Sequence, residues 1–183
     1  MRRLIALLLA GLALAACAPR PTAPAGVALP ALRLAPSALG RELAAQQRLV
    51  FRFGSHVREL DALLEVDAGE VRLAVQAMGR TGVRLQWDGE HLVEQRAAWL
   101  PAAVRGERVL DDVQFSLWPA DAVRAALPAG WSLADTGDVR ELRRDGRAWL
   151  VRERVDAATL RVRNLADGYD LTIASVAGGD PIP

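Results

Sequence analysis

Lysine is absent from this chain of 183 residues, and all 23 basic residues are arginine. The absence has two explanations. A GC-rich genome favours arginine together with the many Ala, Gly, Pro and Leu residues, whereas a functional cause would be recognition of carboxylates or phosphates by planar guanidinium groups. The arginines are balanced by 22 acidic residues, which gives a formal net charge of +1. Nucleic-acid-binding domains are usually strongly basic, so this balance argues against a nucleic-acid partner.

Cysteine and histidine are also scarce, and recognisable catalytic motifs are missing. The single cysteine, Cys17, excludes an internal disulfide. The two histidines, His56 and His91, show no metal-ligand spacing with each other or with Asp61 and Glu90, so no metal site is predicted. The sequence has no Gly-x-Ser-x-Gly, phosphate-loop or His-Glu-x-x-His motif. We therefore expect a protein without enzymatic activity and without a cofactor other than a covalent lipid on Cys17.

The first 17 residues are typical of an export signal that ends in a lipid-modified cysteine. Two arginines precede an apolar stretch over residues 4–16, which is shorter than the roughly 20 residues that span a bilayer. The following Leu-Ala-Ala-Cys17 resembles the lipobox of bacterial lipoproteins. That resemblance implies cleavage before Cys17, a diacylglycerol on its thiol and a fatty acid such as palmitate on the new amino terminus. An ordinary signal peptide with an incidental cysteine is the alternative.

The lipobox also has consequences for location. Two or more acyl chains anchor a protein stably, so the lipid on Cys17 would attach the domain permanently to a membrane. Ala18 follows the cysteine. Because an aspartate at this position resembles an inner-membrane retention signal, the alanine favours the outer membrane, with the domain facing the periplasm.

We divide the chain into four parts. They are a signal peptide at 1–16, the lipidated cysteine with a proline-rich tether at 17–36, a single domain at 37–177 and a frayed tail at 178–183. Prolines favour an extended conformation, so the tether is expected to act as a spacer. Its apolar second half, from Val27 to Leu34, has the alternative of packing against the domain. A short helix is expected from Pro36 to Gln46.

Alternation of apolar and polar residues predicts strands on both sides of a helical segment. A first series of hairpins lies between Gln47 and Gln95, and helical spacing of apolar residues follows between Pro101 and Leu127. Strands resume over residues 131–134, 139–144, 147–154, 159–163 and 169–176. The fold class is therefore α+β: a curled, mostly antiparallel half-barrel of roughly ten strands, with a helical lid inserted in mid-chain.

The apolar residues of the sheet and the helical segment are numerous enough either to fill the core or to line a cavity. For a cavity that holds an acyl chain, the lining candidates are Phe51, Leu64, Leu73, Leu85, Phe115 and Trp118. The helical segment also holds the pair Asp111-Asp112. Neighbouring helix positions do not face each other, so we expect these carboxylates to interact with the helix dipole or with solvent rather than to share a proton.

Several segments resemble an uncharacterised family of bacterial lipoproteins, which is known only as a domain of unknown function. They include residues 77–83 (Ala-Met-Gly-Arg-Thr-Gly-Val), residues 99–101 (Trp-Leu-Pro) and residues 110–119 (Leu-Asp-Asp-Val-Gln-Phe-Ser-Leu-Trp-Pro). The likeness covers roughly residues 39–176. The family is in turn similar to the outer-membrane lipoprotein receptor and its periplasmic carrier, which implies a curled sheet closed by helices over a cavity for lipoprotein acyl chains.

Two hypotheses for function follow. The first is a non-enzymatic lipoprotein, anchored in the outer membrane, that binds or hands on a lipid or a lipoprotein acyl chain. The second is a structural or assembly accessory that binds another envelope protein through a sheet edge or exposed aromatic side chains. Lipid bound to the purified protein favours the first, and a co-purifying protein without lipid favours the second.

Overall fold

Alternating burial along the first strand, β1 (Leu43–Phe53), shows how the sequence forms the sheet. Leu43, Ala45, Gln47 and Leu49 are buried, while the residues between them are exposed. Successive side chains of a strand point to opposite faces, so one face of β1 lies against the core and the other faces solvent. The computed structural model describes residues 27–100 and 105–176. The expected signal peptide, Cys17 and the expected tail at 178–183 lie outside the described residues.

In the described part of the chain, ten strands and two α-helices follow a short 3₁₀ turn, η2 (Pro36–Leu39). The strands after β1 are β2 (His56–Val66), β3 (Val71–Ala77), β4 (Arg80–Trp87), β5 (Leu92–Arg96), β6 (Trp131–Asp135), β7 (Val139–Arg144), β8 (Arg147–Arg154), β9 (Thr159–Asn164) and β10 (Tyr169–Ser175). The helices α2 (Gly106–Leu117) and α3 (Ala120–Ala126) lie between β5 and β6.

The ten strands form one antiparallel sheet in the order β5-β4-β3-β2-β1-β10-β9-β8-β7-β6. All neighbours are consecutive in the chain except β1 and β10. Their pairing, in which Phe51 lies opposite Leu171, joins the meander β1–β5 to the meander β6–β10. Strands β5 and β6 remain as the two edges, so the sheet is open.

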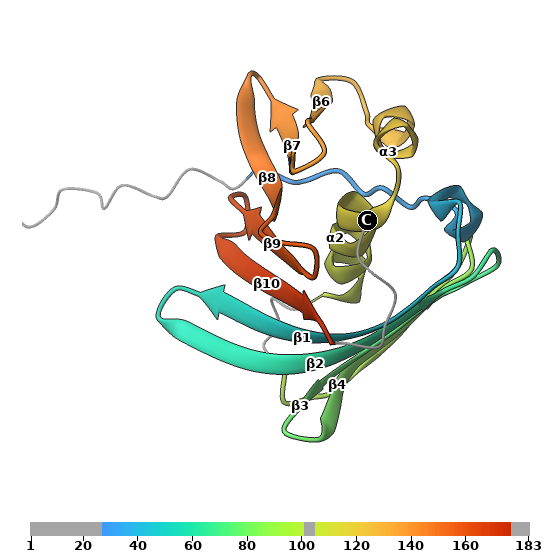
Figure 1. Cartoon of the computed structure of the whole chain (residues 1–183), viewed down its shortest axis with the longest axis vertical. Helices are drawn as coiled ribbons and strands as arrows, with labels where there is room; N and C mark the ends of the chain where they lie inside the picture. The colour runs from blue at the N-terminus through green and yellow to red at the C-terminus, as the bar shows by residue number, and fades with distance from the viewer. Residues whose placement is uncertain (1–26, 101–104, 177–183) are drawn as a thin grey trace, which may run out of the picture.

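The helical segment connects these two edges across the concave face of the sheet. In Figure 1, β1–β4 curve below α2, and β8, β9 and β10 curve beside it. The curl arises because each strand is rotated relative to its neighbour, and ten such rotations accumulate. The predicted α+β class, a curled antiparallel sheet of about ten strands with a helical insertion, is confirmed. Neither of the described helices has the length and apolar character that a membrane crossing requires.

Helix α2 fills the centre of the half-barrel. Leu110, Phe115 and Trp118 have no exposed surface and belong to one core cluster with the buried residues of the sheet. The helix begins beside β5, where Glu94 Oε1 accepts a hydrogen bond from the Gly106 N–H at 3.1 Å. A Cβ atom at position 106 would lie 2.6 Å from the Glu94 carboxyl carbon, so a larger residue would displace this side chain from the start of the helix.

The expected helix from Pro36 to Gln46 is wrong beyond its first turn. Only Pro36–Leu39 is helical, as a 3₁₀ turn that ends at Gly40 with a φ of 78°. Residues 43–46 belong to β1, where Leu43 and Ala45 alternate with exposed neighbours. The period-two pattern of β1 therefore begins at Leu43, four residues before the predicted start at Gln47. Burial in the folded protein outweighs the helix propensity of residues 43–46.

Residues 27–35, here named the strap, lie across α2 before the sheet begins (Figure 1). Leu32 and Leu34 are 6% and 8% exposed and belong to the core cluster, so they pack as core residues rather than as part of a solvated spacer. Of the two interpretations of the tether's second half, packing against the domain is therefore the one that the structure shows.

Candidate functional site

The residues selected as cavity lining lie at the centre of the concave face. Leu64, Leu73 and Leu85 are paired across β2, β3 and β4, and they are at most 5% exposed. Phe115 and Trp118 belong to the same core cluster. The structure thus brings five of the six candidates together in one packed cluster. The sixth, Phe51, is half-buried on β1, with its ring centroid 5.3 Å from that of Tyr169.

Phe51 belongs to a band of half-buried apolar side chains that continues the core on the concave face. We name this band the apolar strip; its members are Phe51, Leu60, Val75, Leu171 and Ile173. Strand register makes it continuous: Leu49 lies between Leu60 and Ile173, and Phe51 lies beside Leu171. Phe53, two residues farther along the same face, is 46% exposed. The concave face therefore changes gradually from a closed core to accessible apolar surface.

A buried polar cluster lies beside the strip, between α2 and β10. Arg108 Nη2 lies 2.8 Å from Asp112 Oδ1, and the Tyr169 hydroxyl donates a hydrogen bond to Asp112 Oδ2. Asp111, on the next helix position, accepts a hydrogen bond from Arg33 Nη1 of the strap at 2.9 Å. The two carboxylates are 5% and 8% exposed and lie beyond the first turn of α2, so neither of the two expected roles, interaction with solvent or with the helix dipole, was correct.

Burial dominates the electrostatics of this cluster. It raises the pKa of Asp112 to about 6, although Arg108 and the Tyr169 hydroxyl act in the opposite direction. Burial likewise raises the pKa of Asp111, and burial next to Asp112 raises that of Tyr169. Burial lowers the pKa of Arg108, but the two carboxylates more than offset this effect and the net change is upward. The cluster joins helix, strap and sheet through charge-assisted hydrogen bonds.

The strap is held by side chains that recognise its backbone. Gln114 accepts a hydrogen bond from the Leu34 N–H at 3.0 Å and donates one to the Leu34 carbonyl at 2.8 Å. The indole N–H groups of Trp87 and Trp118 donate to the carbonyls of Leu34 and Ala35, at 2.8 and 3.0 Å. Asp111 Oδ1 accepts from the backbone N–H of Leu32. These contacts satisfy backbone groups that would otherwise be buried without partners.

Local sequence pattern did not predict the hydrogen bonds to the strap or the polar cluster. A signal was present, because Asp111, Asp112 and Gln114 lie among the apolar residues Val109, Leu110, Val113 and Phe115 that were expected to face the core. Polar residues on a helix that is buried on most sides must find partners inside the protein. Apart from Arg108 on the same helix, their partners lie 57 to 80 positions away in the sequence, so local pattern could not identify them.

A second buried arginine binds the other end of α2. Arg140 Nη1 donates to the carbonyls of Phe115 and Trp118 at 2.7 Å each, and Arg140 Nε lies 2.6 Å from Asp135 Oδ2. The last carbonyls of a helix lack intrahelical donors, and they carry the negative end of the helix dipole. Burial opposes the ionisation of Asp135, but the Gly137 N–H and Arg140 outweigh it and lower the pKa of this carboxyl.

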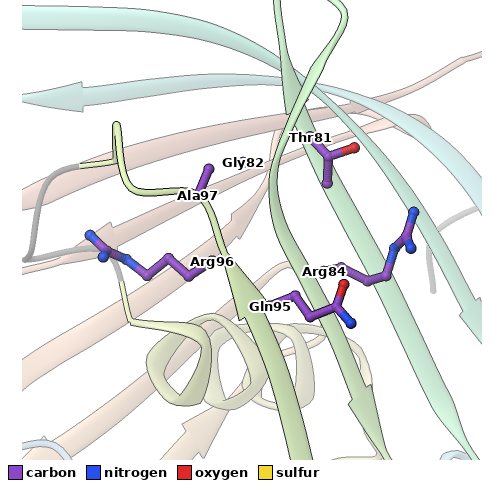
Figure 2. Close-up of a pocket in the computed structure, with 6 residues that line it drawn as sticks. All are labelled: Thr81, Gly82, Arg84, Gln95, Arg96 and Ala97. Carbon is purple, nitrogen blue, oxygen red and sulfur yellow. The ribbon is translucent and has the colours of Figure 1, made fainter.

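A surface hollow of about 280 Å³ lies on strands β4 and β5, away from the apolar strip (Figure 2). It is lined by Thr81, Gly82, Arg84, Gln95, Arg96 and Ala97, none of which was selected as a lining residue. The hollow is open to solvent and its lining is largely polar. It does not resemble the enclosed apolar site expected for an acyl chain.

The described residues also bear on metal binding. His56 begins β2 next to the β1–β2 turn, whereas His91 lies in the β4–β5 turn, where Asp88 is its partner at 3.3 Å. Antiparallel connectivity places these turns on opposite ends of the strands. Within residues 27–100 and 105–176, no group of three or more His, Cys, Asp or Glu side chains is arranged to hold a metal ion.

Comparison with known proteins gives a family but no activity. No curated protein matches the chain. A family model described as a protein of unknown function (DUF3261) matches residues 44–177, from the start of the sheet to the end of β10. The expectation of an uncharacterised family is confirmed at this level, and the strap lies ahead of the matched region. The chain therefore belongs to the DUF3261 family of proteins of unknown function.

Proposed function

We propose that this protein is a lipid-anchored protein of the bacterial outer membrane that faces the periplasm and binds an acyl chain of a lipid or lipoprotein, without catalysing a reaction. The apolar strip is the observation that carries this proposal. Its five side chains are continuous with the core through strand register, yet each remains half-buried. An acyl chain laid along the strip would extend the core outward.

The energetic argument is the burial of apolar surface. Covering the remaining surface of a half-buried Leu, Ile or Phe side chain contributes about 1 kcal/mol. Five such side chains supply about 5 kcal/mol, and each methylene of the acyl chain that is buried adds about 0.8 kcal/mol. Together these contributions offset the cost of immobilising a flexible chain and leave a reversible complex. A reversible complex is what a carrier or receptor requires, since its ligand must leave again. The lipobox at Cys17 supplies the membrane location in which such a ligand is abundant.

Native mass spectrometry of the full-length gene product, extracted from cell membranes, tests the proposal. We expect a bound lipid or acylated peptide in addition to the covalent anchor. Leu171→Arg places a charge in the strip, and we expect it to reduce the occupancy at least tenfold. Thr172→Arg is the matched control, because the adjacent position of β10 faces the convex side of the sheet. An unloaded wild-type protein, or equal loading of the two variants, would contradict the proposal.

The open sheet edges favour a second candidate, an assembly accessory. Strand β5 has a neighbour on one side within the sheet, and residues 93–96 of this strand are exposed. An unpaired edge is a template for strand addition by a partner protein. The same mass-spectrometric experiment separates the candidates, because an accessory would carry a protein partner and no acyl ligand.

A further inference from the structure

Charge is distributed unevenly between the two ends of the strands. The turns β1–β2, β3–β4, β7–β8 and β9–β10 lie at one end of the antiparallel sheet, which we name the basic rim. Within three residues of these turns there are seven arginines and three acidic residues, all aspartates. The turns β2–β3, β4–β5, β6–β7 and β8–β9 form the opposite rim, where the same count gives five arginines and eleven acidic residues. The formal net charge of +1 is therefore the sum of a basic end and an acidic end of the sheet.

Exposed apolar side chains occur at both rims: Val93, Val139 and Val155 lie at the opposite rim, whereas the basic rim carries Met78 in the β3–β4 turn and a group of three beside the β1–β2 turn. Phe53 and Val57 flank the β1–β2 turn and are 46% and 51% exposed, and Leu165 in the β9–β10 turn is 47% exposed. Strand register brings these turns together, because Phe53 is paired with both His56 and Tyr169, which begin β2 and β10. Large exposed apolar groups in such proximity to arginines are typical of surfaces that bind a partner.

Arginine and tryptophan extend this surface. The Leu165 N–H donates to the carbonyl of Trp149, which places β8 beside the β9–β10 turn. The Arg147 guanidinium lies 4.2 Å from the ring centroid of Trp149. Arg52 and Arg58 are exposed on either side of the β1–β2 turn. Tryptophan and arginine favour the headgroup region of a bilayer, where an amphipathic ring and a cation both find partners.

We infer that the β1–β2 and β9–β10 turns form a docking surface for an anionic phospholipid bilayer, so that the domain rests on the membrane with its acidic rim directed away. Each arginine near such a surface contributes about 1 kcal/mol of attraction, and partial insertion of Phe53, Val57 and Leu165 adds apolar burial. In Figure 1 the start of the strap and the β1–β2 turn lie on the same side of the molecule, and η2 lies on the other. The strap therefore begins on the docking side of the domain.

The inference rests on the proposed membrane location, but it concerns a different surface from the acyl-chain site. Hydrogen exchange of the full-length gene product in vesicles tests it. We compare phosphatidylglycerol vesicles with phosphatidylcholine vesicles at physiological salt. Amides at residues 54–57 and 165–168 should exchange at least threefold more slowly on the anionic vesicles. Amides at residues 88–91 and 136–138 of the acidic rim serve as an internal control and should not change.

A charge-reversal pair sharpens the test. Arg52→Glu combined with Arg58→Glu should abolish the difference between the two kinds of vesicle. Arg48→Glu is the matched control, because Arg48 lies on the same face of β1 as Arg52 but roughly 13 Å from it along the strand, more than the Debye length. Equal exchange on both kinds of vesicle would overturn the inference. Protection confined to the acidic rim, or to Met78 and Gly79 in the β3–β4 turn outside the proposed surface, would also overturn it. Loss of acyl-chain binding in the mass-spectrometric experiment would leave these exchange results unaffected.

Discussion

The Tyr169 hydroxyl donates a hydrogen bond to Asp112 Oδ2, so the first residue of β10 is joined to the middle of helix α2. Arg108 occupies the other oxygen of the same carboxylate. The three groups hold the helix against the strand that connects the two halves of the sheet. Asp112 therefore links α2 to β10, and protonation of its carboxylate is expected to change the strength of that link.

Removing the tyrosine hydroxyl should weaken the fold in a pH-dependent way. Tyr169→Phe keeps the ring that contacts Phe51 but leaves Asp112 Oδ2 buried without its donor. A lost donor to a buried acceptor costs about 1–3 kcal/mol, and an ionised acceptor lies at the upper end. We expect urea denaturation to show this loss at pH 7 and a smaller loss at pH 4.5, where Asp112 is protonated. A loss that is independent of pH would contradict the role assigned to the pair.

Stability should rise as pH falls from about 6 towards 4. The pKa of Asp112 is about 6 in the folded protein, compared with 3.8 for an unperturbed aspartate, because burial penalises its ionised form. In this window the folded protein binds a proton that the unfolded chain does not, so acidification favours folding. The raised pKa of Asp111 acts in the same direction. The lowered pKa of Asp135 has the opposite sign, and its contribution is lost below about pH 4.

Thermal denaturation between pH 4.5 and 7 measures this dependence, with Asp112→Asn as the comparison. The amide does not titrate, so the variant should show a flatter profile across the window. It should also be less stable overall, because Arg108 loses the nearer of its two carboxylate partners inside the protein. An unchanged slope in Asp112→Asn would assign the titration to another group.

The sheet was predictable because its two faces differ in environment. Period-two alternation in segments such as residues 71–77 is a local property, and tight turns such as Asp88-Gly89 mark the hairpins. The pairing of β1 with β10 was not predictable from local pattern, since it joins Phe51 to a residue 120 positions away. The strand start at Leu43 was missed because Ala44, Ala45 and Gln46 are equally compatible with a helix. Burial of Leu43 and Ala45 in the folded protein favours the strand.

The candidate site was predictable only in its apolar part. Leu64, Leu73 and Leu85 were identified as inward-facing from alternation alone, and the structure pairs them. The charged part depends on contacts between distant segments, such as Arg33 with Asp111. The rim polarity was hidden for a different reason: the net charge of +1 sums over two ends of opposite sign. A cavity for an acyl chain and the lipid on Cys17 stay predictions.

The attachment of the strap to α2 should depend on Gln114. Its side-chain amide makes two hydrogen bonds to Leu34, and both groups are buried. Gln114→Leu should leave the Leu34 N–H without a partner and increase the rate of its hydrogen exchange at least tenfold. Gln86→Leu on the exposed face of β4 is the matched control and should leave the strap unchanged. Equal exchange at Leu34 in both variants would show that burial of Leu32 and Leu34 alone holds the strap.

Arg140 should contribute more to stability than any exposed arginine. Arg140→Met keeps the aliphatic stem but removes the donor to Asp135 Oδ2 and to the carbonyls of Phe115 and Trp118. Breaking a buried ion pair by removing one partner costs about 3–5 kcal/mol, because the other charge remains buried. Arg124→Met is the control: Arg124 also pairs with an aspartate at 2.6 Å, but on the surface of α3, where such pairs contribute about 0–1 kcal/mol. We expect urea denaturation to show free energies of unfolding that differ by at least about 2 kcal/mol between the two variants. Similar values for both would show that Arg140 reaches solvent and that α2 does not depend on the hydrogen bonds from Arg140 to its last carbonyls.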